Sequence, residues 1–274
     1  MHSEDFFNLL TQEYSIKLAT SPQDFQAVKE VRREVFSHKY NMTPTLLENK
    51  GYLFSKDDIQ SFIYLLRHNT TNSYVGTVRL FFINGTTPLQ KLPMQKDGNV
   101  KDNVIKNMMH TFPICEISRL ALVNTLPRYK DYSALRLRTY LAMLLMISTR
   151  LNLFLYHQNT IFAIMEPSLH LILKRQNVRF RQIGKPVEYY GIRTPFGIER
   201  KKLLQDTEET MGTITRHYLK ELCQNPDSFW EFIDNNPYLE RSDIQLDRIC
   251  QLFKEYGDDV DLSLLLGEDA PSMA

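Results

Sequence analysis

The chain contains only three cysteines among its 274 residues, and no two of them form a CxxC pair. A small, odd and scattered set fits a reducing compartment better than a disulfide framework. Long hydrophobic runs are also missing, because the most apolar one, residues 141–147, is far shorter than the roughly 20 residues that span a bilayer. The N-terminus is acidic and lacks the apolar core of a signal peptide. We therefore expect a cytoplasmic protein without a transmembrane segment.

An excess of charge of one sign is absent as well. The formal net charge is +1, which gives no reason to expect nucleic acid as a partner. The seven histidines are scattered without metal-ligand spacing, so we expect no metal site. The sequence has no internal repeat, and its length suits one large domain or one domain with an appendage, at roughly 100–200 residues per domain.

The chain does contain a succession of strand and helix patterns. A helix is predicted over 5–14, a strand over 15–19, and a second helix from Pro22, with Ser21 as its cap. The runs 62–67 and 74–82 predict a hairpin. Strands at 114–123 and 160–165 each precede a helix, and two last strands are predicted at 180–183 and 187–192. Long loops are expected over 38–56 and 83–110, and helices after about residue 199. This order predicts an α+β (or α/β) fold.

Three charged residues interrupt apolar strand patterns. Arg79 lies in the run Val-Gly-Thr-Val-Arg-Leu-Phe-Phe at 75–82, and Glu116 and Arg119 lie in Cys-Glu-Ile-Ser-Arg-Leu at 115–120. Alternation along a strand places Glu116 and Ser118 on one face and Arg119 on the other. Charges on core strands are costly unless they are paired or used. This cost is the first indication of an active site.

The order of the motifs is more specific than any one of them. The runs Val-Arg-Arg-Glu-Val-Phe at 31–36, Gly-Thr-Val-Arg-Leu at 76–80 and Glu-Ile-Ser-Arg-Leu at 116–120 resemble the autoinducer-synthase branch of the GNAT-like acyltransferases. The runs Met-Glu-Pro-Ser-Leu at 165–169 and Ile-Gly-Lys-Pro-Val-Glu-Tyr-Tyr-Gly-Ile-Arg-Thr-Pro at 183–195 resemble the N-acyl amino acid synthase group, especially the acyltransferases associated with PEP-CTERM/exosortase systems. The resemblance covers about residues 20–197.

This resemblance implies a GNAT-like fold, in which a splayed, mostly antiparallel sheet flanked by helices opens a cleft for the pantetheine arm of an acyl carrier. The amine of a small acceptor attacks the acyl thioester directly, and no cofactor stays bound. The residues carried over as the cleft set are Arg32, Phe36, Asp58, Arg79, Glu116, Ser118 and Arg119. We expect an acyltransferase domain over residues 1–200 and a helical C-terminal extension over 201–274, packed on the core.

Two departures from the family pattern concern the substrates. Autoinducer synthases place a tryptophan shortly after the phenylalanine and an aspartate just before the one matching Asp58, whereas this chain has Asn41, Met42 and Ser55 near those places. Those features help to bind S-adenosylmethionine, so their absence favours a different acceptor. Residues 124–136 contain no glycine and therefore no phosphate-cradling loop of the usual GNAT kind. This favours an acyl carrier protein over acyl-CoA as donor.

Glu116 is the candidate general base, because aminolysis must remove a proton from the attacking amine. The alternative is a carboxylate that only pairs with Arg79 or Arg32. Arg79 and Arg119 are candidates for binding the acceptor's carboxylate through two parallel hydrogen bonds, and the alternative for each is a buried ion pair. The predicted catalytic set is Glu116, Ser118 and Arg119, with an oxyanion-binding amide expected near residues 120–123.

Three further sets of residues each allow a functional and a structural interpretation. Tyr189, Tyr190 and Arg193 are predicted to line the acceptor end of the cleft, although Tyr189 fits equally well in a strand core. Cys115 has no activating histidine nearby and is interpreted as a small core residue. A basic cluster beside the cleft suits docking of an acidic carrier protein, the alternative being a solvated helix face. It consists of Arg128, Lys130, Arg136 and Arg138.

The leading hypothesis is an N-acyltransferase that moves a long-chain acyl group from acyl-phosphopantetheine on an acyl carrier protein to the amine of an amino acid or a similar small acceptor. One alternative is an acyl-homoserine-lactone autoinducer synthase that uses S-adenosylmethionine. Another is a non-catalytic module that binds acyl carriers. The missing tryptophan counts against the first alternative, and the presence of Glu116 with both cleft arginines counts against the second.

Overall fold

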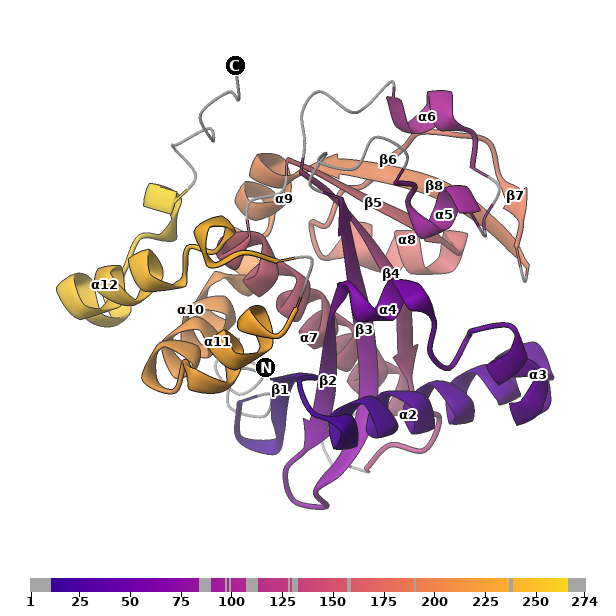
Figure 1. Cartoon of the computed structure of the whole chain (residues 1–274), viewed down its shortest axis with the longest axis horizontal. Helices are drawn as coiled ribbons and strands as arrows, with labels where there is room; N and C mark the ends of the chain where they lie inside the picture. The colour runs from indigo at the N-terminus through magenta and orange to yellow at the C-terminus, as the bar shows by residue number, and fades with distance from the viewer. Residues whose placement is uncertain are drawn as a thin grey trace.

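Figure 1 shows a computed structural model of the chain. It describes residues 11–83, 90–96, 98, 100–106, 113–127, 129, 133–156, 159–189, 191–236 and 239–265. The strands in these residues are β1 (Tyr14–Leu18), β2 (Ser61–His68), β3 (Ser73–Ile83), β4 (Ile114–Leu122), β5 (Thr160–Met165), β6 (Arg181–Gln182), β7 (Val187–Glu188) and β8 (Ile192–Glu199). The α-helices are α2 (Pro22–Tyr40), α3 (Pro44–Asn49), α4 (Lys56–Ile59), α5 (Pro93–Lys96), α6 (Asp102–Lys106), α7 (Ala134–Leu155), α8 (Pro167–Arg175), α9 (Arg200–Asp206), α10 (Glu208–Gln224), α11 (Asp227–Asp234) and α12 (Leu246–Tyr256).

The strands form one mixed sheet in the order β1-β2-β3-β4-β5-β8-β6, with β7 paired to β8. Strands β4 and β5 run parallel, and the other pairs are antiparallel. The parallel pairing ends at Ile117 and Ala163, although β4 continues to Leu122. The two strands therefore diverge beyond that point. The predicted α+β class and the splayed, mostly antiparallel sheet flanked by helices are confirmed.

Helices α2 and α7 cover opposite faces of the sheet, α2 in front and α7 behind in the view of Figure 1. The alternation of side chains along β2 separates the two faces. Ile63 and Leu65 pack with Val28 of α2, whereas Phe62 and Tyr64 belong to the main hydrophobic core that contains the buried side of α7. These two faces are called the α2 face and the α7 face below.

Helix α2 begins where the sequence indicates. The Ser21 hydroxyl accepts a hydrogen bond from the Asp24 amide, and the Asp24 carboxylate accepts one from the Ser21 amide, which closes a capping box. The predicted loop 38–56 is wrong in part, because α2 continues to Tyr40 and α3 occupies the middle of the segment. The helix predicted over 5–14 lies mostly outside the described residues, and Tyr14 already belongs to β1.

The strands after α8 differ from the prediction. Among the described residues of the segments predicted at 180–183 and 187–192, the strand residues are Arg181–Gln182, Val187–Glu188 and Ile192, the first residue of β8. The long strand is β8. It pairs with β5 along its length, from Glu199 opposite Thr160 to Thr194 opposite Met165. Its sequence contains Pro195 and Gly197, two residues that are depleted in strands. The strand forms because tertiary pairing with β5 outweighs this local preference.

Helices α10 to α12 lie on the β1 side of the sheet, and α9 follows β8 and contacts it (Figure 1). Helix α10 packs against α7, and its residues Met211, Ile214, Tyr218 and Leu219 are buried in the same hydrophobic core as α7. This burial agrees with the helical spacing of these residues in the sequence. The division into residues 1–200 and 201–274 stays a prediction.

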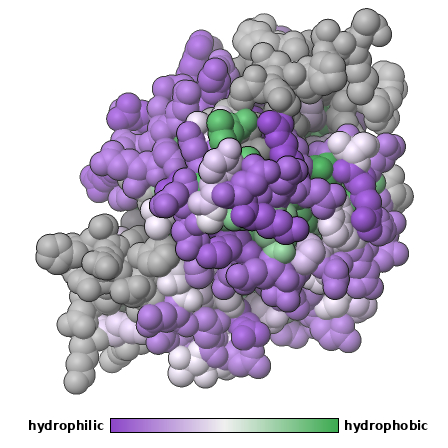
Figure 2. Space-filling view, turned by 90° about the vertical axis from the view of Figure 1, so that its left-hand side faces the viewer, coloured by the Kyte–Doolittle hydropathy of each residue, from purple (hydrophilic) through white to green (hydrophobic). Residues whose placement is uncertain are grey.

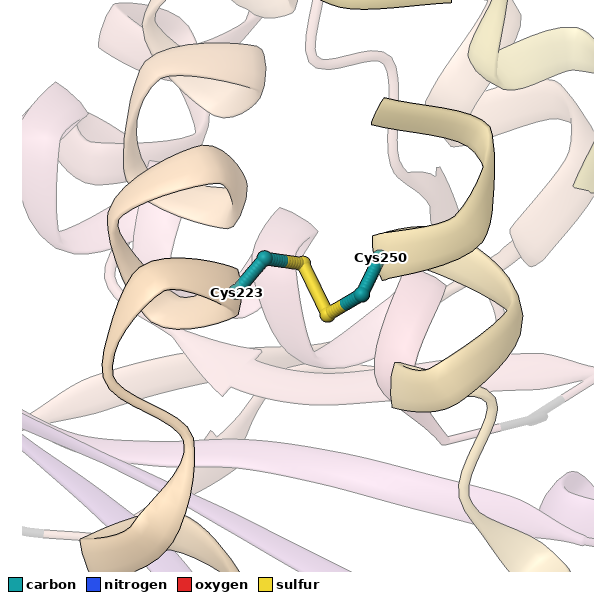
Figure 3. The surroundings of a disulfide bond; sticks show 2 residues. All are labelled: Cys223 and Cys250. Atoms are coloured by element: carbon teal, nitrogen blue, oxygen red, sulfur yellow. A yellow bond between two sulfur atoms is a disulfide. The ribbon is translucent and has the colours of Figure 1, made fainter. Parts of the chain in front are cut away.

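A disulfide bond joins Cys223 of α10 to Cys250 of α12 (Figure 3). The expectation that the cysteines form no disulfide is therefore wrong. The two residues are 27 positions apart, and only the packing of α10 beside α12 brings their Cα atoms within 5.2 Å. The bond also removes the cysteine-based argument for a reducing compartment.

The surface over the C-terminal helices is mostly hydrophilic and carries only small hydrophobic patches (Figure 2). In the part of the chain that the structure describes, no helix combines the length and the apolar character needed to cross a membrane.

Candidate functional site

A cavity of about 240 Å³ lies where β4 and β5 diverge. It joins the two faces of the sheet, because its wall includes residues from both. Seven of the sequence-predicted site residues line it. They are Phe36, Arg79, Glu116, Ser118, Arg119, Tyr189 and Arg193.

The two sides of the cavity differ in polarity. On the α2 face its wall carries Glu116, Ser118 and Arg79, together with residues of α2 and of the segment before α4. On the α7 face it is apolar and is formed by Met146, Ala163, Met165, Leu169, Leu173 and Phe180. A ligand with a polar end and an aliphatic end matches this division, because each end then meets groups of its own kind.

A β-bulge shapes the β4 wall. Arg79 of β3 pairs with Ser118 of β4, and Thr77 pairs with Ala121, so that two residues of β4 stand opposite one residue of β3. One of these two, Arg119, has φ of +55°, in the left-handed region that non-glycine residues rarely adopt. The predicted alternation of faces therefore holds up to Ser118 and fails at Arg119. Side chains from 116 to 120 all line the cavity as a result.

Glu116 is buried in the wall of the cavity, with a fractional exposure of 1%. Its Oε2 atom accepts a hydrogen bond of 2.7 Å from the backbone amide of Met94, at the start of α5. Glu116 stands opposite Phe81 of β3, so its side chain leaves the sheet on the α2 face. The carboxylate is thus held in a fixed position on the polar side of the cavity, where a general base would be needed.

Behind this wall lies a network of buried charges. Arg32 of α2 donates to the Asp58 carboxylate at 2.8 Å and to the Leu53 carbonyl at 3.0 Å, and Arg79 lies 3.6 Å from the same carboxylate. Burial raises the pKa of Asp58, but the guanidinium groups of Arg32, Arg79 and Arg119 hold it at about 2. Burial lowers the pKa of Arg32 to about 10 against the opposing effect of Asp58. Arg32 and Asp58 therefore support the site from behind.

The two cleft arginines already have partners in the protein. Arg79 Nε donates to the Ser118 hydroxyl at 3.0 Å. Arg119 donates to the carbonyls of Tyr52 and Gly51 at 3.0 and 3.2 Å, and its guanidinium lies 4.9 Å from the centre of the Tyr52 ring. Arg119 thereby fixes the segment before α4 against β4. Arg79 is paired with the Asp58 carboxylate, so the ion-pair alternative fits Arg79, whereas the hydrogen-bond partners of Arg119 are backbone carbonyls.

The rim of the cavity holds a group of charged residues, of which the sequence analysis predicted only Arg193. Glu166 Oε1 lies 2.7 Å from Lys39 Nζ and 3.1 Å from Arg193 Nη2, and Arg193 Nη2 also donates to the Tyr40 hydroxyl at 3.1 Å. Arg193 Nε donates to the Tyr189 carbonyl, which joins two of the predicted residues of the acceptor end; the third, Tyr190, lies outside the described residues. Lys39, Tyr40 and Glu166 were not predicted as site residues. The available signals were the position of Lys39 three residues after Phe36 on one helix and the run Met-Glu-Pro-Ser-Leu at 165–169, which contains Glu166.

The predicted docking cluster is described only in part. Arg128 and Lys130 lie outside the described residues. Arg136 is exposed near the start of α7 and donates to the Tyr140 hydroxyl at 2.7 Å. Arg138 donates to the Val123 carbonyl at 2.7 Å and to the Leu122 carbonyl, so it is bound to the end of β4. Arg136 is therefore the better placed of these two for contact with a partner.

Cys115 is fully buried on the α7 face, as expected of a core residue. Burial and the neighbouring Glu116 carboxylate raise the pKa of its thiol, which disfavours the nucleophilic thiolate. Among the described residues, no group of three or more His, Cys, Asp or Glu side chains is arranged to hold a metal ion.

A second cavity, of about 340 Å³, lies at the β1 edge of the sheet. Its wall comes from β1, α7, α10 and α11, and the polar residues on it include Lys17 and Asp24, which are paired at 2.7 Å. None of the sequence-predicted site residues lines it. The first cavity is therefore the candidate active site, although it is the smaller one.

The structure of the chain is similar to several solved structures. No family model and no curated protein sequence matches the chain. FeeM, an N-acyl amino acid synthase from uncultured soil microbes, superposes with a TM-score of 0.47 and 15% identity over 71% of this chain and 94% of that one. The AHL synthase LasI superposes with a TM-score of 0.43 and 13% identity over 72% and 95%. A candidate acetyltransferase of the GNAT family from Desulfovibrio desulfuricans gives 0.42 and 11% over 68% and 99%. Likeness at this level does not identify a substrate.

Proposed function

We propose that the protein is an N-acyltransferase that moves a long-chain fatty acyl group from a carrier thioester to the amine of an amino acid or a similar small acceptor. One observation carries the proposal. The cavity between the diverging strands β4 and β5 has a buried carboxylate, Glu116, on its polar side and a continuous apolar wall on the other. An acyl chain fits the apolar side, and an amine fits the side with the carboxylate.

In the proposed reaction the amine nitrogen attacks the thioester carbonyl carbon, and the carbon–sulfur bond then breaks. Glu116 takes a proton from the attacking nitrogen, directly or through a water molecule. The departing sulfur leaves as a thiolate that gains a proton, so the products are an amide and a free thiol. Cys115 takes no part in this scheme, because its thiol is buried and is held in the protonated form.

The negative charge that develops on the carbonyl oxygen needs a hydrogen-bond donor. The predicted donor was a backbone amide at residues 120–123. The Val123 amide already donates to the Val75 carbonyl at 2.9 Å, and of residues 120–123 only Leu120 lines the cavity. We therefore assign the role to the amide of Leu120, which follows the left-handed Arg119 in the bulge. Arg119 then acts by fixing this turn of backbone, and Ser118 by its hydrogen bond to Arg79.

The remaining predicted residues take supporting or binding roles. Phe36 forms part of the cavity wall beside the acceptor, and Arg32 and Asp58 support Arg79 from behind. Tyr189 and Arg193 bound the acceptor end. The narrower resemblance to acyltransferases of PEP-CTERM/exosortase systems stays a prediction from the sequence motifs.

The proposed donor is an acyl group on an acyl carrier protein, with the phosphopantetheine arm entering between β4 and β5. Two exposed neighbours near the start of α7 support docking of an acidic, partly apolar protein surface there. They are Leu135, with 75% of its surface exposed, and Arg136. A basic residue beside an exposed apolar one suits such a partner, because charge steers the encounter and the apolar contact holds it.

The test is to express the chain in a bacterial host and to analyse the lipid extract by mass spectrometry, with Glu116→Gln expressed at the same level as control. An acyl amino acid that appears only with the unchanged chain supports the proposal. An acyl-homoserine lactone would assign the autoinducer-synthase reaction. The absence of any new lipid, from a folded protein that still binds an acyl carrier protein, would favour the non-catalytic alternative.

A further inference from the structure

The rim of the candidate active site carries two cations on a single carboxylate oxygen. Lys39 Nζ and Arg193 Nη2 both contact Oε1 of Glu166, at 2.7 and 3.1 Å. The three side chains line the cavity. Their formal charges sum to +1, so the group retains attraction for one further anion. A carboxylate is a chemical match, because it offers two oxygens to a guanidinium and an ammonium that already bind a carboxylate here.

The location of these three side chains indicates which substrate they contact. Lys39 and Tyr40 come from the C-terminal end of α2, on the polar side of the cavity. Glu166 follows β5, and Arg193 lies in β8, both beyond the point where β4 and β5 diverge. The apolar wall that suits an acyl chain lies on the α7 face. The charged group therefore stands at the end where the acceptor enters.

We propose that Lys39 and Arg193 bind the carboxylate of the acceptor and thereby select amino acids over amines that lack a carboxylate. This inference rests on the proposed acyl transfer and names its acceptor class. Glu166 holds the two cations in position, and the Tyr40 hydroxyl holds Arg193. Of the two arginines that the sequence suggested for this role, Arg79 is only 1% exposed and donates to the Ser118 hydroxyl, and Arg119 donates to two backbone carbonyls.

The phosphate of a carrier's pantetheine arm is the competing anion for this site. The same two cations would then serve the donor, and their loss would weaken donor binding. The exposed Lys39 gives the cleaner test, because its side chain is 44% exposed and its removal leaves no buried cavity. Arg193, with a side chain 13% exposed, provides the second variant.

The experiment measures kcat and KM for the amino acid that the unchanged enzyme acylates fastest and for the carboxamide of that amino acid. We expect the carboxylate form to be preferred by about 10–100-fold in kcat/KM, the range of one or two charge-assisted hydrogen bonds. Lys39→Met and Arg193→Met should reduce this preference to a few-fold by raising the acceptor KM while the donor KM stays the same. Lys174→Met, the same change on an exposed lysine at the far end of α8, is the matched control.

Thermal shift with millimolar amino acid or carboxamide gives a second readout, independent of turnover. Acyl transfer without preference for the carboxylate form would overturn the inference and leave the proposed function standing. If Lys39→Met and Arg193→Met change the donor KM and leave the acceptor KM unchanged, the two cations bind the donor, and the inference is overturned as well. If no transfer occurs but stabilisation by the amino acid depends on Lys39 and Arg193, the site stands and the proposed function fails. If the unchanged protein shows neither acyl transfer nor stabilisation by the amino acid, both the inference and the proposed function are rejected.

Discussion

Arg79 of β3 and Ser118 of β4 stand directly opposite each other, and their side chains are hydrogen bonded at 3.0 Å. The pair comes immediately before the bulge at Arg119. Arg79 also reaches Asp58, which is bound to Arg32. The buried ion network is thereby connected to the strand that carries Glu116. This connection keeps the polar wall of the cavity in one arrangement, which a catalytic site requires.

Replacement of Glu116 by glutamine should lower turnover by roughly 10²–10⁴-fold, the usual contribution of a general base. The amide keeps the shape of the side chain but accepts no proton at neutral pH. The measurement is the single-turnover rate with acyl carrier protein and acceptor, alongside the unfolding temperature. Near-normal turnover from a folded Glu116→Gln protein would make the carboxylate a structural group.

Cys115→Ala is the matched control for that variant, because Cys115 is the adjacent residue on the same strand and points to the other face. Its buried thiol makes no proposed contribution to the chemistry, so we expect turnover within a few-fold of normal. Some stability should be lost, because a buried side chain becomes smaller. Trapping of an acyl group on Cys115 would reject direct attack by the amine.

Asp58→Asn should lower the free energy of unfolding by about 3–5 kcal/mol, because it leaves the buried Arg32 without its counter-ion. The unchanged protein should show a related dependence on pH. The pKa of Asp58 is about 2 in the folded state against an ordinary value of 3.8, so the unfolded chain binds the proton more tightly. The stabilisation, about 2 kcal/mol, is present above pH 4 and is lost as the pH falls toward 2. Urea unfolding across this range should show that loss in the unchanged protein and lack it in Asp58→Asn.

Removal of the Cys223–Cys250 bond should lower the free energy of unfolding by about 3–4 kcal/mol, since the bond closes a loop of 27 residues in the unfolded chain. Denaturant melts of Cys223→Ser and Cys250→Ser, with and without reductant, measure the effect. Reductant should destabilise the unchanged protein and leave both variants unaffected. Equal stability of oxidised and reduced protein would contradict the expectation.

Arg136→Glu should raise the KM for an acyl carrier protein at low salt, because it repels an acidic partner. The loss should shrink as salt rises, since exposed charges are screened beyond about 8–10 Å at physiological ionic strength. Activity with an acyl-pantetheine fragment should not change. Lys254→Glu, on the exposed side of α12, is the control of equal charge change. An equal loss with both donors would assign the effect to the cavity itself.

A chain ending at residue 200 should aggregate, because Met211, Ile214 and Leu219 of the extension are buried in the same core as α7. Their loss exposes the apolar surface of α7 to water. Size-exclusion chromatography and activity measure the outcome, with a chain ending at Gly267 as the control. A soluble and fully active 1–200 fragment would make the C-terminal helices an independent appendage.

Features that depend on residues close together in the chain could be predicted from the amino-acid sequence. Ser21 and Asp24 are three residues apart, so their capping box and the start of α2 follow from local spacing. The hairpin of β2 and β3 and the helix α7 follow from periodicity in the same way. The motif around Glu116 and Arg119 could be recognised because charged residues are unusual in an apolar strand pattern. The resemblance of the motifs to acyltransferases led to the predicted fold.

Contacts between groups far apart in the chain could not be predicted in this way, because they depend on how the elements pack. The bulge at Arg119 depends on how β4 pairs with β3, and the contact of Lys39, Glu166 and Arg193 brings together three elements far apart in the chain. The strand β8 forms against its local preferences because β5 offers a partner. Cys223 and Cys250 meet because α10 and α12 pack side by side. Local hydrogen bonding and side-chain period are encoded within a few residues, whereas these contacts arise only when the closed fold supplies the partner.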